Sequence, residues 1–202
     1  MSADPSRPNR ADRRVVAAVT AVIADDLDRT RDIAETARII EKASAGVVLT
    51  RGGDVLPLPG LPDDRMLAPG SPILTVAADE LANSGAYTSF LAPAPGAGAE
   101  LIRVTALDCA RPDLDHLSAA VLLGPPGILH GLTVLDLRVL GLLVEGVTDI
   151  PALGPALHVG MAAVADSLGR CLAALGASDL TAAAVRALRD GMRIPPGVTG
   201  AT

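Results

Sequence analysis

The sequence has almost no aromatic residues, with one Phe, one Tyr and no Trp among 202 residues. Half of the residues are nevertheless hydrophobic, so the core must be built from Leu, Val, Ile and Ala. A chain of this length holds one large domain, or an ordinary domain and a small one, because typical domains have about 100–150 residues. A cofactor site lined by aromatic rings is not expected.

Lysine and cysteine are also scarce. Lys42 is the only lysine, and the remaining basic residues are arginines. Together with abundant Ala, Gly, Pro, Val and Asp, this bias is typical of a high-GC bacterial genome. The net charge of −6 repels nucleic acid and acidic membranes at long range, so DNA binding requires a local basic patch. Cys109 and Cys171 are too far apart for a metal-binding spacing or a disulfide scaffold, which fits a reduced cytoplasm.

A long apolar run is missing as well. The arginines near the N-terminus are followed by no apolar signal-peptide core. No stretch of about 18 uncharged apolar residues occurs anywhere. We therefore expect a cytoplasmic protein without a signal peptide or a membrane span.

The N-terminal part of the sequence is polar and then helical. Residues 1–10 are polar and contain proline, which is typical of a disordered tail. Residues 11–44 have helical spacing of apolar residues, compatible with one helix or two. This segment is either a dimerising signalling helix or a cover for a sheet. Cover is favoured, because the apolar spacing drifts away from a strict heptad.

Strand patterns and turn residues dominate residues 45–124. A β-branched run, a Gly-Gly turn and a second short run predict a hairpin, and Pro57 and Pro59 restrict its second strand to an edge. A helix is predicted between Ser71, as N-cap, and Gly85. Three strands follow, near residues 86–93, 100–109 and 117–124. We expect an antiparallel sheet with helices on one side, with Val104 and Val121 on its covered face.

Beyond the Gly- and Pro-rich linker 125–131, only helical patterns occur up to residue 196, and 197–202 form a tail. The domain boundary is therefore expected near residue 130. The first of four predicted helices has Thr133 as N-cap, Asp136 at the capping-box position and Gly146 as its stop. The inward-facing residues are expected to be Leu137, Leu140 and Val144 in the first helix, Val164, Leu168, Leu172 and Leu175 in the third, and Val185 and Leu188 in the fourth.

Three stretches of this helical segment carry a family resemblance. They are "LTVLDLRVLGLLVEG", "PALGPALHVGMAAV" and "CLAALGASDLTAAAVRALRDGMRIPP". In order and spacing they resemble the LuxR-type (NarL/FixJ-like) helix-turn-helix of bacterial transcription regulators, over about 70 residues. The resemblance implies a DNA-binding module whose last helix pairs subunits. Such a module often follows a PAS- or GAF-like sensor domain, which residues 45–124 resemble in strand order.

The middle of the module departs from the family pattern. Pro151 and Pro155 fall where the family's scaffold helix is free of proline, and one extra residue precedes Leu157. A proline inside a helix costs about 3 kcal/mol. From residue 147 to 180 the only arginine is Arg170, against three aspartates, a net charge of −2. Few phosphates can be neutralised by this segment, and only Arg170 can make a bidentate contact with a base.

The sequence thus predicts an α+β protein with a PAS/GAF-like antiparallel sheet and a C-terminal four-helix module, and not an enzyme. The favoured function is a dimeric transcription regulator, with DNA binding weakened or lost. The alternative is a regulatory protein that binds a protein partner through the helical module. The residues that the resemblance and the charge pattern place against DNA are Ala163, Ser167, Arg170, Arg186, Arg189 and Arg193.

Other chemistry finds no support in the sequence. His116 has aspartates beside it, but no second cluster supplies further metal ligands, so a solvated loop is the favoured interpretation. Cys109 has no paired base and is better explained as a small buried thiol. The segment 51–54, "RGGD", is a turn rather than a phosphate loop. No metal or cofactor is expected, and the signal of the N-terminal domain is not defined by the sequence.

Overall fold

The computed structural model describes residues 39–96, 100–109 and 116–198. The chain divides into two compact units, residues 1–41 and residues 42–202. Within the first unit only residues 39–41 are described, and they are helical. The expected tail 1–10 and most of the segment 11–44 therefore lie outside the described residues. Because residues 42–202 form one unit, the predicted division near residue 130 remains a prediction. We call residues 45–124 the sheet region and residues 132–196 the helical module.

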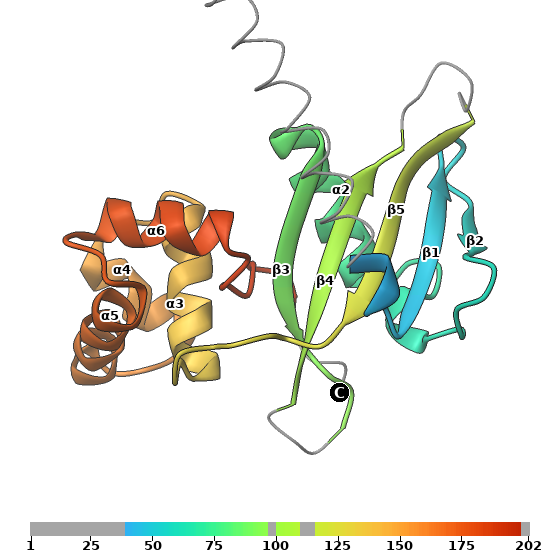
Figure 1. Ribbon diagram of the computed structural model, residues 1–202. Coiled ribbons are helices and arrows are strands. Elements are labelled where there is room, and N and C mark those ends of the chain that lie inside the picture. The colour runs from blue at the N-terminus through green and yellow to red at the C-terminus, as the bar shows by residue number, and fades with distance from the viewer. Residues whose placement is uncertain (1–38, 97–99, 110–115, 199–202) are drawn as a thin grey trace, which may run out of the picture. The chain divides into compact units, whose positions relative to one another are not determined.

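The sheet region contains five antiparallel strands in the order β2-β1-β5-β4-β3 (Figure 1). With the helical module described below, this confirms the predicted α+β class. The strands are β1 (Ala45–Thr50), β2 (Val55–Pro57), β3 (Tyr87–Pro93), β4 (Leu101–Asp108) and β5 (Leu117–Gly124). The hairpin of β1 and β2 is confirmed, and β2 lies at the edge of the sheet, where the missing N–H of Pro57 is tolerated.

One helix, α2 (Pro72–Ser84), packs on the sheet against β3, β4 and β5. Its predicted ends are confirmed. The Ser71 hydroxyl accepts a hydrogen bond from the Ile73 N–H, and the helix stops at Gly85, whose φ of 91° favours glycine. The short 3₁₀ helix η1 (Arg65–Leu67), which precedes α2, was not predicted.

The core of the sheet region is aliphatic, as the composition requires. Val104 and Val121 are both fully buried, which confirms their predicted placement. They belong to the same hydrophobic cluster as the inner face of α2, formed by Ile73, Leu74, Ala77 and Leu81. Each large apolar side chain buried in this way contributes about 1.5–3 kcal/mol.

The helical module contains the four predicted helices: α3 (Val134–Val144), α4 (Ile150–Leu157), α5 (Met161–Leu175) and α6 (Leu180–Arg189). The predicted capping box is present, because Thr133 and Asp136 each accept a hydrogen bond from the other's backbone N–H. The predicted inward residues Val164, Leu168 and Leu175 are buried, and Leu172 is half-buried.

The predicted inner face of α6 is wrong. Val185 and Leu188 are 60% and 46% exposed, whereas Ala183 and Ala187 are fully buried. The usual rule places the larger apolar side chains inward. Here the small alanine side chains point inward, in a helix that packs mainly against α3. The larger side chains therefore remain on the outside.

No single helix in the described part of the chain is long and apolar enough to cross a membrane. The bent pair of α5 and α6, with 61° between the two helices, passes this test only when the two are taken together.

Candidate functional site

The helices α4 and α5 form a unit of two consecutive helices with a short turn between them. They are joined by residues 158–160, and His158 ends α4 in the left-handed conformation. Both prolines lie in α4. Pro151 is in its first turn, where proline is favoured, and Pro155 is inside the helix, where its missing N–H leaves one helical hydrogen bond unmade. Gly154 packs closely against the turn, since a Cβ atom there would lie 3.0 Å from the Val159 carbonyl oxygen.

The second helix of this unit presents a face with little charge. Its exposed residues include Met161, Ala162, Ala165, Asp166, Gly169, Arg170 and Ala173. One acid and one base balance each other on this face. Apart from Arg170, none of these side chains is an Arg, Lys, Asn or Gln that could make a bidentate contact with a base.

Arg170 is occupied by a contact inside the module. Its Nη2 lies 2.8 Å from Asp136 Oδ1 and its Nε 3.1 Å from Oδ2, so the guanidinium binds the carboxylate with two hydrogen bonds. The buried Ser167 hydroxyl donates to Asp136 Oδ1 at 2.6 Å. Asp136 itself is fully buried on α3, whereas the Arg170 side chain is 46% exposed. Arg170 and Ser167 therefore tie α5 to α3.

The surroundings of Asp136 stabilise its charged form. Burial alone would raise the pKa of this carboxyl group. Hydrogen bonds from Arg170, Ser167 and Thr133 outweigh the burial and lower the pKa from 3.8 to about 2. The carboxylate accepts five hydrogen bonds in all. Asp136 is thus an anion that joins the start of α3 to the middle of α5.

We expect Asp136 to make the stability of the module depend on pH. Because its pKa is lower in the folded state, its contribution is present above about pH 4 and is lost as the pH falls through about 2. The contribution is about 2 kcal/mol, because one pKa unit corresponds to about 1.4 kcal/mol. Urea unfolding at pH 7 should show that Asp136→Asn is less stable than the wild type, and this difference should shrink toward pH 2.

The matched control is Asp149→Asn, because the exposed Asp149 makes no capping hydrogen bond with its side chain. This variant should have the same free energy of unfolding as the wild type at each pH. A difference between Asp136→Asn and wild type that stays constant from pH 7 to pH 2 would contradict the role of the Asp136 charge.

The other arginines predicted to contact DNA also have partners. Arg186 donates to the carbonyl oxygens of Leu175 and Gly176 and so caps the C-terminus of α5. Arg189 pairs with its neighbour Asp190 while 72% of its side chain is exposed. Arg193 is fully buried and pairs with Glu80 of α2.

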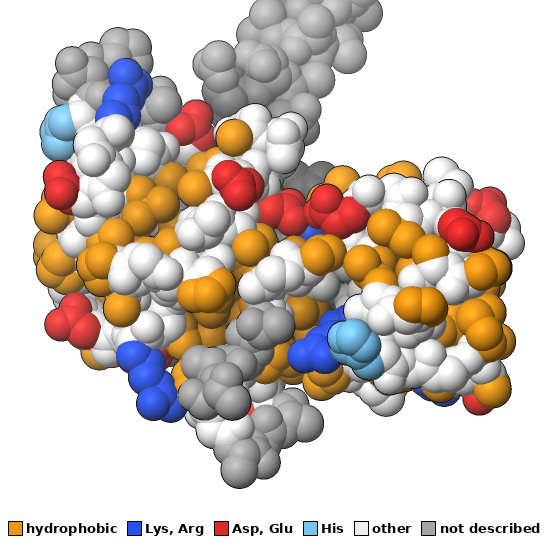
Figure 2. All heavy atoms as spheres, turned by 180° about the vertical axis from the view of Figure 1, so that it is seen from behind, with side chains coloured by type: hydrophobic (Ala, Val, Ile, Leu, Met, Phe, Trp, Pro, Cys, Tyr) orange, Lys and Arg blue, Asp and Glu red, His pale blue; other side chains and the backbone are white. Residues whose placement is uncertain are grey.

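The six predicted residues therefore do not form one surface. Ser167 and Arg193 are buried and Ala163 is half-buried, whereas Arg170, Arg186 and Arg189 are exposed. Figure 2 shows a face on which basic side chains form separate spots, and acidic side chains gather where the sheet region meets the helical module.

One exposed arginine was missed in the sequence. Arg138, on α3, is the only arginine of the helical module without a hydrogen bond or ion pair among the described residues. With His158 it lines a hollow of about 280 Å³ that also includes the C-terminal residues 194–198. The sequence did contain a signal that Arg138 is exposed, because residue 138 lies on the side of α3 opposite the apolar stripe. Arg138 is the cation of this module that is most available to an external anion.

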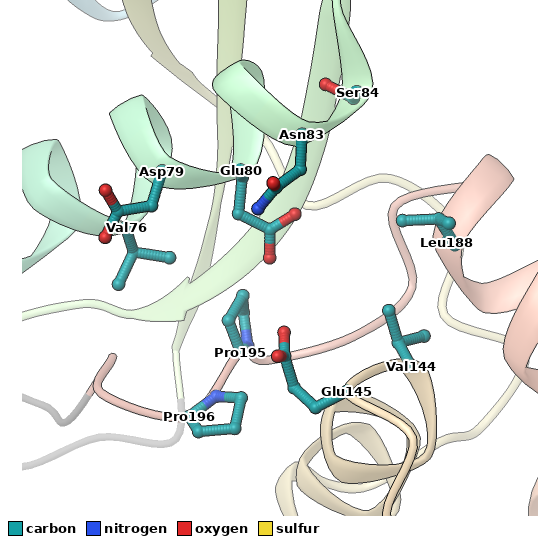
Figure 3. A pocket seen from close by; sticks show the side chains of 10 residues that line it. All are labelled: Val76, Asp79, Glu80, Asn83, Ser84, Val144, Glu145, Leu188, Pro195 and Pro196. Carbon is teal, nitrogen blue, oxygen red and sulfur yellow. The ribbon is translucent and has the colours of Figure 1, made fainter.

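A cleft of about 430 Å³ lies between α2 and the helical module (Figure 3). Its walls combine apolar residues with the carboxylates of Asp79, Glu80 and Glu145. In Figure 3, Glu80 from α2 and Glu145 from the end of α3 point toward the same space. Pro195 and Pro196, from the C-terminal segment, lie beside them.

The two cysteine thiols are not activated as nucleophiles, because their pKa values are raised. Burial raises the pKa of Cys171 to about 12, and the nearby Asp136 adds to this shift. Burial also raises the pKa of Cys109. Within the described ranges no group of three His, Cys, Asp or Glu side chains could hold a metal ion. His116 is exposed, and the aspartates before it lie outside the described residues.

No protein-family model matches the chain, and no curated protein matches it by sequence. Among solved structures, a Vibrio cholerae VqmA dimer without target DNA, a LuxR-type receptor, is 14% identical. This match covers 81% of this chain and 91% of that one, with a TM-score of 0.36.

A phage VqmA–DPO complex is 18% identical, covers 61% of this chain and has a TM-score of 0.32. The chain spans only 65% of that phage protein. The Vibrio cholerae VqmA–ligand–DNA complex is 13% identical, with 81% and 91% coverage and a TM-score of 0.31.

Proposed function

We propose that this chain is a two-domain transcription regulator, in which a PAS/GAF-like sheet region controls a LuxR-type helix-turn-helix module. The observation that supports this most is the helical module itself. Four helices follow one another in the order that the sequence resemblance implies. The second and third of these helices, α4 and α5, are joined by a three-residue turn. The sheet region, with one helix on a five-stranded antiparallel sheet, suits a sensor.

In this proposal contact with DNA is made by few cations. Arg170 would have to exchange Asp136 for a phosphate or a base, and Arg186 and Arg189 would add peripheral contacts. Arg138 is available without such an exchange. Arg193 could contribute only if it left Glu80. Affinity is therefore expected to be weak, since phosphate neutralisation supplies a large share of it.

A second candidate function is favoured by the exposed face of α5. Alanines, one glycine and one methionine occupy most of this face, and its two charges cancel. Such a surface suits contact with an apolar partner better than contact with a polyanion. In this second proposal the protein keeps the helix-turn-helix fold and regulates by binding another protein.

The test is a fluorescence titration of the purified chain with its own upstream DNA and with a scrambled duplex. A DNA-binding regulator should bind its own DNA more tightly than the non-specific level of about 10⁻⁴ M, prefer it to the scrambled duplex, and lose this preference in Arg170→Ala. Arg138→Ala should weaken binding to both duplexes equally, because a phosphate contact carries no sequence information.

Arg65→Ala is the matched control, since it removes an exposed arginine from the sheet region. It should leave both titrations unchanged. Circular dichroism of each variant separates lost binding from lost folding. Equally weak binding of both duplexes, near the non-specific level of about 10⁻⁴ M, would contradict DNA recognition and favour the protein-binding alternative.

A further inference from the structure

The segment after α6, residues 190–198, runs between the sheet region and α3. On one side the Leu91 N–H of β3 donates to the Arg193 carbonyl at 2.8 Å. On the other side the Ile194 N–H donates to the Leu137 carbonyl of α3 at 2.9 Å. Since β3 is an edge strand, the segment satisfies a backbone group that would otherwise be unpaired.

The side chain of Arg193 anchors this segment to α2. It is fully buried, and it forms two hydrogen bonds with Glu80, whose side chain is 15% exposed. The Nε of Arg193 is buried without a partner in the described structure. A buried ion pair contributes little net stability when its hydrogen bonds are incomplete, but removing one partner leaves a costly buried charge. The intact ion pair therefore adds little net stability to the junction, but the loss of Glu80 would destabilise the junction.

Arg103, on β4, holds the chain at both of its crossings between the two regions. Its Nη2 donates to the Pro126 carbonyl in the linker at 2.7 Å. Its Nη1 donates to the Asp190 carbonyl at 3.1 Å, and to that of Gly191 at 3.4 Å. The linker itself contains three residues with positive φ, Gly127, His130 and Gly131. Such residues mark places where the chain direction can change.

We infer that the ion pair between Glu80 and Arg193 is a latch between α2 and the C-terminal segment, and that opening it frees the helical module from the sheet region. Opening would hydrate the Arg193 guanidinium, and the linker would act as the hinge. The cleft beside Glu80 shows that the two regions are not fully packed against each other there. A use of the latch in signalling rests on the proposed function, in which the sheet region is a sensor and the helical module its output. The existence of the latch does not rest on that function.

The test is amide hydrogen exchange of the full chain, which requires neither DNA nor a ligand. In Glu80→Gln the amides of Leu91 and Ile194 should exchange at least about tenfold faster, because both hydrogen bonds break on opening. The amides inside β4 and α5 should keep their wild-type rates. Combining Glu80→Arg with Arg193→Glu should restore slow exchange at Leu91 and Ile194.

Asp79→Asn is the matched control. Asp79 lines the same cleft from the same helix, but it has no ion pair within the described part of the chain. In this variant the amides of Leu91 and Ile194 should exchange at the wild-type rates. Unchanged rates at Leu91 and Ile194 in Glu80→Gln would overturn the latch. Uniformly faster exchange across β4 and α5 would also overturn it, because the pair would then only support global stability.

Discussion

Gly141→Ala should destabilise the protein, although alanine is the better helix former. On propensity alone, this change inside α3 would stabilise by about 1 kcal/mol. A Cβ atom at residue 141, however, would lie 2.0 Å from the Ile194 carbonyl oxygen and 2.9 Å from its carbon. The C-terminal segment would have to move away from α3, which strains the hydrogen bond from Ile194 to Leu137. Overpacking of this kind costs about 1–3 kcal/mol.

Gly169→Ala provides the matched control for Gly141→Ala. Gly169 lies inside α5 and is exposed, and a Cβ atom there would meet nothing within 4 Å. This variant should become more stable by about 1 kcal/mol, as propensity predicts. Urea unfolding of both variants gives the comparison. Equal stabilisation of the two would show that the C-terminal segment does not pack on α3 in this way.

Leu168→Asp should unfold the helical module. Leu168 is 7% exposed on the inner face of α5. An unpaired carboxylate at this position costs several kcal/mol, comparable with the whole stability of a small module. Circular dichroism should show a loss of helical signal, with a lower melting temperature. Ala165→Asp places the same charge on the exposed face of α5, and it should cost less than about 1 kcal/mol. Unchanged melting of Leu168→Asp would refute the placement of α5.

The local features of the fold could be predicted because each depends on neighbouring residues. The hairpin of β1 and β2 follows from its Gly-Gly turn, and the ends of α2 and α3 follow from Ser71, Gly85 and Thr133. The faces of α6 could not be predicted, because they depend on how closely α3 approaches. Ala183 and Ala187 face inward, which periodicity alone does not reveal.

The contacts that occupy the arginines could not be predicted, because they join distant parts of the chain. Arg170 meets Asp136 across 34 residues, and Arg193 meets Glu80 across 113. One signal was available in the sequence. Asp136 lies four residues before Leu140 and seven before Leu143, on the buried side of α3. A carboxylate in such a position needs a cation, and Arg170 was the only arginine between residues 147 and 180.

The central claim is that most arginines of the helical module hold the fold together and are not available to phosphates. The salt dependence of duplex binding tests this most directly, because each phosphate contact adds about −0.9 to the slope of log K against log salt. We predict for the full chain a slope shallower than about −3, since few arginines of the described helical module are free of partners. A slope of about −6 or steeper that becomes shallower by about 1 in Arg170→Ala, with sub-micromolar affinity for the protein's own upstream DNA, would contradict the account, because Arg170 would then have left Asp136 for a phosphate.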